Sequence, residues 1–336
     1  MIESKPDISL TKFSEALRNG EVVAFPTETV YGLGADAWNA DAVARIFALK
    51  GRPPDNPLIV HVGSVEMVSS LAVKISDDAL QLMERFWPGP LTIIFPKRAE
   101  VLDIVTAGLP TVAVRMPDHP IPLRLISLAG PLAAPSANTS GRPSPTRAEH
   151  VYQDFGDDVP VIDGGSCQYG LESTVIDLSQ IPYTVLRPGH ITQSELEHAL
   201  QQPVRMVASR PGDLSGAAPQ SPGMKYTHYA PDAQVRWMKD SELPWPARPE
   251  KRTLYLLHRE RSGNKPSSFP TGPENSSPAY QIIHYRENYT EMARDLYDRF
   301  RMADLQGFEE VAIEPFQEAG DMTAALLNRM LKAIRD

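Results

Sequence analysis

The stretch "EVVAFPTETVYGLG", residues 21–34, is the most informative part of the sequence for the fold. An apolar, β-prone run leads into a segment that ends in two glycines, which predicts a strand running into a turn at the edge of a pocket. That turn crowds together four polar side chains, those of Thr27, Glu28, Thr29 and Tyr31. A plain turn does not need them, so we expect them to face a ligand; the alternative is that the hydroxyls only cap a helix.

The composition describes an ordinary globular protein of two domains. The 336 residues exceed the roughly 250–300 that one hydrophobic core usually serves. A net charge of −9 argues against a protein whose main function is to bind nucleic acid, because such binding depends on Lys and Arg side chains that neutralise phosphates. Cys167 is the only cysteine, which excludes an intramolecular disulfide and favours a structural or incidental thiol. With no secretory or membrane pattern, we expect the protein in the cytoplasm.

Residues 1–205 alternate helix-like and strand-like patterns. Helix signals include Asp41 as an N-cap, Gly51 as a stop, Ser76 as an N-cap, and a capping box formed by Thr192 and Glu195. Strand-like runs occupy residues 57–62, 91–95, 111–116, 159–165, 173–179 and 183–189. Because strands outnumber helices in the second half, the pattern predicts an α/β domain with a mixed sheet.

The remainder of the chain divides in two. Residues 206–232 lack periodicity and are rich in Gly, Pro and Ser, which predicts a linker, although "SPGMKYTHYAPD" holds more Lys and Tyr than a spacer needs. Residues 233–336 interleave three strand-like runs with two helical patterns, which predicts a smaller three-layer α/β domain.

A first cationic cluster lies in "LKGRPPDNPLIVH", residues 49–61. Lys50 falls in the last turn of a predicted helix, where a lone cation is also explained by the helix dipole. Arg52 follows the stop glycine and precedes two prolines, so both charged groups can converge on one point. With Asn56 and His61 close behind, the cluster suits a phosphate or a carboxylate.

A second cluster, "AAPSANTSGRPSPTR" at residues 133–147, is rich in hydroxyl and amide groups. Small donors on a tight turn after a strand can cradle oxyanions, but the same residues are common in polar surface loops. Elsewhere Arg115 ends an apolar strand, where an arginine needs an anionic partner from the protein or from a ligand. Ser173, Thr174 and Arg187 also lie at strand ends.

Several familiar sites are absent from the sequence. It holds no Walker loop, no complete dinucleotide fingerprint, no HExxH and no GxSxG, so neither a zinc hydrolase nor a serine hydrolase is indicated.

Seven motifs, in order, resemble those of the threonylcarbamoyl-adenylate synthase family, the YrdC-like proteins, over residues 9 to about 200. They are "PTETVYGLG", "KGRPPDNPLIVH", "FWPGPLT", "VAVRMPDHP", "APSANTSGRPSPT", "GGSCQYGLESTVID" and "LRPG". The segment "SPGMKYTHYAP" and the tail resemble the long form of the family, whose linker folds back over the active site. The resemblance implies a YrdC-like domain with a twisted mixed sheet flanked by helices, followed by a Rossmann-like domain.

The resemblance also implies an activity, that of a nucleotidyltransferase. Such an enzyme converts L-threonine, bicarbonate or CO2, and ATP into threonylcarbamoyl-AMP and pyrophosphate, with Mg²⁺ bridging the phosphates and no dedicated protein ligands for it. The product would pass to other proteins that modify the adenosine next to the anticodon of certain tRNAs. No membrane and no tight nucleic-acid binding are expected.

The same resemblance assigns residues to roles. The catalytic signatures match Lys50, Arg52, Ser136 and Asn138. L-threonine would be bound by Thr29, His61, Arg115 and Ser173. The nucleotide would be bound by the four catalytic residues together with Asn56, Thr111, Ser144, Arg187, Tyr226 and Tyr229.

Other classes stay open from the sequence alone. An RNA-binding or regulatory YrdC-like module without turnover is the main alternative, and the negative charge disfavours RNA binding. A sugar-phosphate lyase of similar fold would need an acidic metal cluster, whereas Glu28 stands alone in its segment.

Overall fold

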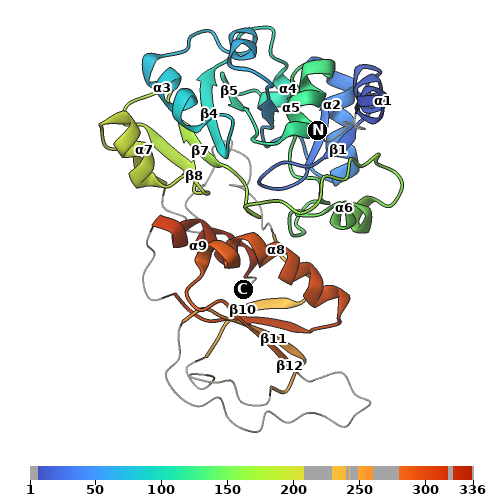
Figure 1. Cartoon of the computed structure of the whole chain (residues 1–336), viewed down its shortest axis with the longest axis vertical. Helices are drawn as coiled ribbons and strands as arrows, with labels where there is room; N and C mark the ends of the chain where they lie inside the picture. The colour runs from blue at the N-terminus through green and yellow to red at the C-terminus, as the bar shows by residue number, and fades with distance from the viewer. Residues whose placement is uncertain are drawn as a thin grey trace, which may run out of the picture. The chain divides into compact units, whose positions relative to one another are not determined.

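The computed structural model describes residues 7–207, 229–239, 242, 249–259, 280–316 and 321–334. The chain forms two compact units (Figure 1), one of Met1–Ser140 with Ser144–Tyr226 and one of Gly141–Pro143 with Thr227–Asp336. Most of the expected linker, residues 206–232, falls outside the described residues, so the linker and its boundaries stay a prediction. Among the described residues, every helix is too short or too polar to span a bilayer.

The first unit is built on a nine-stranded sheet with the order β1-β2-β6-β3-β5-β4-β7-β8-β9. Its strands are β1 (Val23–Phe25), β2 (Gly32–Asp36), β3 (Ile59–His61), β4 (Leu91–Pro96), β5 (Thr111–Arg115), β6 (Leu132–Ala133), β7 (Thr174–Asp177), β8 (Thr184–Arg187) and β9 (Arg205–Met206). The pairs β3–β5, β4–β7 and β8–β9 are parallel and the others antiparallel. The predicted mixed sheet is confirmed.

Helices flank this sheet, and most of their predicted ends are confirmed. They are α1 (Asp7–Arg18), α2 (Ala40–Lys50), α3 (Asp77–Phe86), α4 (Asp103–Thr106), α5 (Pro120–Ala129), α6 (Ala148–Phe155), α7 (Gln193–Leu200) and a 3-10 turn at Val65–Ser70. Ser76 caps α3, and α7 begins with the expected capping box. Gly51 ends α2 with φ 61°, a left-handed conformation that suits glycine.

The N-cap predicted for α2 was wrong by two residues. The side chain of Asn39, not that of Asp41, accepts a hydrogen bond from the Ala42 amide at 3.0 Å. Asp41 lies in the first turn instead, where a carboxylate is still favoured by the helix dipole.

The predicted strand at residues 159–165 was also wrong. Val161 makes only an isolated bridge with Ala24. Pro160 has no amide hydrogen to donate to a ladder, and Gly165 turns the chain with φ 80°. The helices α5 and α6 were missed, the first because its two prolines hide a helix that begins with Pro120.

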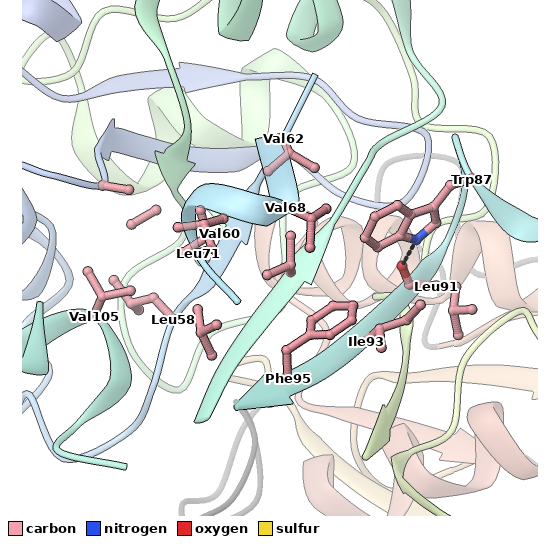
Figure 2. Close-up of a cluster of buried hydrophobic side chains, with 14 of the residues drawn as sticks. Leu58, Val60, Val62, Val68, Leu71, Trp87, Leu91, Ile93, Phe95 and Val105 are labelled. Atoms are coloured by element: carbon pink, nitrogen blue, oxygen red, sulfur yellow. Dashed lines mark hydrogen bonds between the residues drawn. The ribbon is translucent and has the colours of Figure 1, made fainter. Parts of the chain in front are cut away.

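Alternation along the strands gives the sheet two different faces. One face carries Val60, Val114 and Ile93 into the large core, part of which Figure 2 shows. In that cluster the Trp87 indole nitrogen donates to the Leu91 carbonyl oxygen at 2.7 Å. Because neighbouring positions on a strand point to opposite sides, His61 lies on the other face. That face also has a smaller apolar cluster, made of Ile59, Ile94, Ala113, Val175 and Leu186.

The two glycines of the opening motif were expected to form a turn, but in the structure they allow close packing within a strand. Gly32 and Gly34 lie inside strand β2, and neither has a positive φ. A Cβ at Gly34 would come 2.5 Å from Cε1 of Phe25, and one at Gly32 would come 3.1 Å from its Cζ. The glycines therefore make room for the Phe25 ring rather than for a tight turn.

We expect Gly34→Ala to lower the free energy of unfolding by about 1–3 kcal/mol, because the added methyl group overpacks against this ring. Denaturant titration measures the change. The control is Gly34→Ala combined with Phe25→Leu, in which the smaller side chain relieves the clash. If the double variant loses as much free energy of unfolding as the two single variants together, the Phe25 ring is not the reason that position 34 is a glycine.

The second unit contains a parallel four-stranded sheet of order β10-β13-β11-β12. Its elements are β10 (Gln234–Trp237), β11 (Thr253–Leu257), β12 (Tyr280–His284), α8 (Tyr289–Leu305), β13 (Glu310–Ile313) and α9 (Asp321–Ala333). Strand β10 was not predicted. The helices α8 and α9 contact each other and lie on the same side of the sheet (Figure 1), so the described residues supply two of the three expected layers. The smaller α/β unit itself is confirmed.

Candidate active site

Arg115 lies at the centre of a polar group on the face of the first sheet opposite the large core. It ends strand β5, where His61 of β3 and Thr92 of β4 are its direct neighbours in register. Residues opposite each other in register share a face, so the three side chains lie together. The smaller apolar cluster continues this face along the strands.

The opening motif lies against Arg115. Arg115 is 3% exposed, and its guanidinium donates from Nη1 to the Thr29 hydroxyl at 2.9 Å and from Nε to the Gly89 carbonyl at 3.2 Å. Its Nη2 lies 2.6 Å from Oε1 of Glu28 in a buried ion pair. The anionic partner that Arg115 requires is therefore, in this structure, a carboxylate of the protein.

The polar residues of the motif divide into two kinds. The Thr27 hydroxyl donates to the Val30 carbonyl at 2.7 Å, so its single proton is used and it accepts from Thr29 at 2.9 Å. The Tyr31 hydroxyl donates to the Gly165 carbonyl at 2.8 Å, and the ring lies in the core. Thr27 and Tyr31 therefore shape the turn, whereas Thr29 and Glu28 face Arg115.

His61 is a neutral member of the group. Burial, and then the nearby charge of Arg115, lower the pKa of His61 to about 3. Its imidazole thus carries no charge at physiological pH and offers polar nitrogen atoms without repelling a cation. The Phe25 ring stands edge-on to it, with ring centroids 6.1 Å apart.

Ser173 and Arg187 join the same group through Thr92. The hydroxyl groups of Thr92 and Ser173 are 2.7 Å apart. Arg187 donates from Nη2 to the Ser173 hydroxyl and from Nε to the Ser173 carbonyl, both at 3.0 Å. Sequence reasoning missed Thr92, although it is the one polar residue in "LTIIF" at residues 91–95, an alternation signal that could have found it.

The two loop clusters separated in sequence are brought together. The Lys50 ammonium donates to the Ser136 carbonyl at 2.7 Å and also to the Asn138 carbonyl. The Ser136 hydroxyl donates to Oδ1 of Asn138 at 2.5 Å, and the Ser140 amide donates to the Lys50 carbonyl at 2.9 Å. Lys50 thus fixes the loop that follows β6.

Arg52 contacts a different segment. Its Nη2 donates to the Asn56 carbonyl at 2.8 Å, and the guanidinium lies over the Phe47 ring at 5.9 Å from the centroid. The Asn56 side chain is fully buried, and neither its amide nitrogen nor its amide oxygen has a hydrogen-bond partner among the described residues. A buried amide of this kind is costly unless a polar ligand engages it.

The other predicted nucleotide residues are spread more widely. The Ser144 hydroxyl donates to Oε1 of Glu172 at 2.6 Å. Thr111 begins β5, four residues before Arg115, which is roughly 13 Å along a strand. Tyr226 lies outside the described residues, and Tyr229 is buried in the second unit, stacked on Tyr297 at 5.3 Å. Nucleotide binding by these residues stays a prediction.

The cysteine is inert in this fold. Cys167 is buried, and burial raises the pKa of its thiol to about 12. The predicted structural role fits this position. Within the described residues there is also no group of three His, Cys, Asp or Glu side chains that could hold a metal ion.

A mixed sheet with buried cations and hydroxyl groups on one face, followed by a parallel α/β unit, defines a two-domain protein of the YrdC class. A family model described as "Telomere recombination" matches residues 15–189, and one described as "Threonylcarbamoyl-AMP synthase, C-terminal domain" matches residues 191–334. The chain belongs to the threonylcarbamoyl-AMP synthase family.

Individual relatives agree with this assignment over nearly the whole chain. The threonylcarbamoyl-AMP synthase of Pyrococcus abyssi is 44% identical, covering 94% of this chain and 91% of the relative. That of Bacillus subtilis is 42% identical, covering 98% and 94%. A solved structure described as P. abyssi Sua5 complexed with L-threonine matches with a TM-score of 0.83 and 39% identity, covering 98% of this chain and 95% of that one.

Proposed function

We propose that this protein is a nucleotidyltransferase that makes threonylcarbamoyl-AMP and pyrophosphate from L-threonine, bicarbonate or CO2, and ATP. The observation that carries the proposal is the buried group of Arg115, Thr29 and Ser173 in the same unit as the loop that Lys50 fixes. Full-length relatives bear the name of this activity, and one of them is described with L-threonine bound.

The chemistry suits a site with no protein nucleophile. Threonine is carboxylated on its amino group, and an oxygen of the resulting carbamate attacks the α-phosphorus of ATP and displaces pyrophosphate. Such a reaction depends on alignment and on neutralising negative charge. Buried cations and hydroxyl groups supply both, while the protonated Cys167 thiol and the weakly basic His61, whose pKa is lowered to about 3, are poor nucleophiles.

The two substrates would use different parts of the site. Arg115 would pair with the threonine carboxylate, with Thr29, His61 and Ser173 around the rest of the amino acid. The nucleotide and its phosphates would be bound by Lys50, Arg52, Asn56, Thr111, Ser136, Asn138, Ser144, Arg187, Tyr226 and Tyr229.

We propose that Mg²⁺ is bound by the phosphates of the nucleotide rather than by side chains of the protein. The described residues offer no carboxylate cluster that fits a protein-held Mg²⁺ site. Mg²⁺ commonly keeps most of its water and binds through substrate phosphates. We propose that the product passes to cytoplasmic proteins that modify tRNA. The net charge of −9 fits an enzyme that does not itself bind RNA tightly.

The direct test is incubation with ATP, Mg²⁺, bicarbonate and each of the twenty amino acids in turn, following pyrophosphate release. We expect a response with threonine and not with the other amino acids, with threonylcarbamoyl-AMP identified by mass spectrometry. Absence of turnover, together with tRNA retention that weakens steeply with salt, would instead favour an RNA-binding module.

A further inference from the structure

We propose that Glu28 binds the α-ammonium group of L-threonine and accepts the proton that carbamate formation releases. This inference rests on the proposed function and deepens it, because it fixes how the amino acid is oriented and adds a catalytic residue to the site.

The first observation is the unused hydrogen-bonding capacity of Glu28. The side chain is 1% exposed, yet neither carboxylate oxygen accepts a hydrogen bond from any described residue, because the 2.6 Å contact with Arg115 is poorly directed. Buried carboxylates normally accept several hydrogen bonds. Glu172, another buried acid of this unit, accepts one from Ser144 at 2.6 Å. The main chain of Glu28 is held by the Tyr169 amide, which donates to the Glu28 carbonyl at 2.8 Å.

The second observation is the charge balance of the site. Glu28 and Arg115 form a buried pair of opposite charges with no net charge. Threonine enters as a zwitterion, which also has no net charge. If its carboxylate pairs with Arg115, the negative charge of Glu28 loses part of its compensation, and the α-ammonium is the cation that can restore it. The four charges then alternate, and each has an opposite neighbour.

Carbamate formation from threonine and bicarbonate releases a proton and so requires an acceptor for it. Threonine with a protonated amine and bicarbonate combine to give the carbamate, one water and one proton. The Glu28 carboxylate first takes one proton from the α-ammonium and becomes a carboxylic acid, which frees the nitrogen lone pair. The lone pair then forms the new bond to the bicarbonate carbon, and a second proton of the nitrogen goes to the hydroxyl group that leaves as water. With Glu28 as the acceptor, the atoms and the total charge are the same before and after the step.

Neighbouring groups are poor alternatives for this task. Burial and Arg115 lower the pKa of His61 to about 3, so its imidazole is a weak base, and burial also lowers the pKa of His119, at the start of α5. Burial raises the pKa of Cys167 to about 12 and raises the pKa of Tyr169, so both already hold their protons. Asp118 is a further charged group here and acts on His119 and Tyr169 as Glu28 does, while the charge of Arg115 acts on His61 and Cys167.

A binding experiment tests the ammonium contact. The dissociation constants of L-threonine and of 2,3-dihydroxybutanoate, in which a hydroxyl replaces the ammonium, are measured by calorimetry for the wild type and for Glu28→Gln. We expect Glu28→Gln to weaken threonine binding at least tenfold and to leave binding of the analogue unchanged or tighter. A purely structural role would weaken both ligands alike, and that result would overturn the ammonium contact.

A kinetic experiment tests the proton transfer. We expect Glu28→Gln to reduce kcat for threonine-dependent pyrophosphate release about 10²-fold, the usual contribution of a general base. Asp118→Asn, an exposed neighbouring acid, is the matched control and should keep the wild-type kcat. A wild-type kcat in Glu28→Gln would overturn the proton transfer.

A second variant keeps the test decisive if Glu28→Gln does not fold. Glu28→Asp preserves the charge but withdraws the carboxylate by one methylene, roughly 1 Å or more, and we expect a kcat loss of about 10-fold or greater. A wild-type kcat in Glu28→Asp would equally overturn the role of Glu28 in catalysis. Should the wild type release no pyrophosphate with threonine, the proposed function fails; should the wild type be active and the Glu28 variants unchanged, the role of Glu28 alone fails.

Discussion

Replacing Arg115 by methionine is expected to lower the free energy of unfolding of the protein by about 3–5 kcal/mol, the usual cost of leaving one partner of a buried ion pair alone. Arg115 is 3% exposed and its guanidinium compensates the charge of Glu28 at 2.6 Å, so its loss leaves a buried carboxylate without a partner. The same change removes the donor to Thr29 and, with it, the proposed anchor of the threonine carboxylate. Denaturant unfolding and threonine binding by calorimetry measure the two effects.

Two comparisons separate the ion pair from a general effect of losing an arginine. Arg98→Met removes an exposed pair with Glu100 at 3.5 Å and should cost less than about 1 kcal/mol. Arg115→Met combined with Glu28→Leu removes both charges and should recover much of the lost stability while threonine binding stays absent. A double variant as unstable as the sum of the single ones would show that the two side chains do not depend on each other.

The second large effect is expected at Lys50. Lys50→Met should reduce threonine-dependent pyrophosphate release by at least about 10²-fold, because loss of the ammonium leaves the Ser136 carbonyl without this donor and lets the loop move from its catalytic position. Lys50→Arg should restore little, since a planar guanidinium cannot take the place of a compact ammonium between two carbonyl groups. Steady-state kinetics of pyrophosphate release provide the measurement.

Arg45 offers a matched control on the same helix. It is exposed and donates to the Gly20 carbonyl at 3.0 Å, away from the loop that Lys50 fixes. Arg45→Met should therefore retain the wild-type rate. If Lys50→Met were as active as Arg45→Met, the loop would not depend on the ammonium.

The sequence predicted those parts of the fold that follow from local patterns. Alternation and apolar runs marked most strands of the mixed sheet, and capping residues such as Ser76, Thr192 and Gly51 marked helix ends. Patterns failed where a local signal has two meanings. The two prolines of α5 argued against a helix that is present, and the valines around Pro160 indicated a strand that is absent. The glycines of the opening motif indicated a turn, but they are needed for packing against the Phe25 ring.

The site could be predicted as a set of residues but not as a set of contacts. Lys50 and Arg52 are two positions apart, yet the structure directs Lys50 to Ser136 and Arg52 to Asn56, because one ends a helix and the other follows its left-handed stop. The pairing of Glu28 with Arg115 joins positions far apart in the chain, and no local pattern encodes such a contact. Thr92 enters the site only because its strand lies next to β5.

The burial of Cys167 has a practical consequence for experiments in solution. Since this is the chain's only cysteine and burial keeps its thiol protonated, a maleimide added to the folded protein at neutral pH should find almost no thiolate to attack. A cysteine introduced at an exposed position would accept a fluorophore or spin label selectively, so labelled protein can be prepared without altering the native residue at 167.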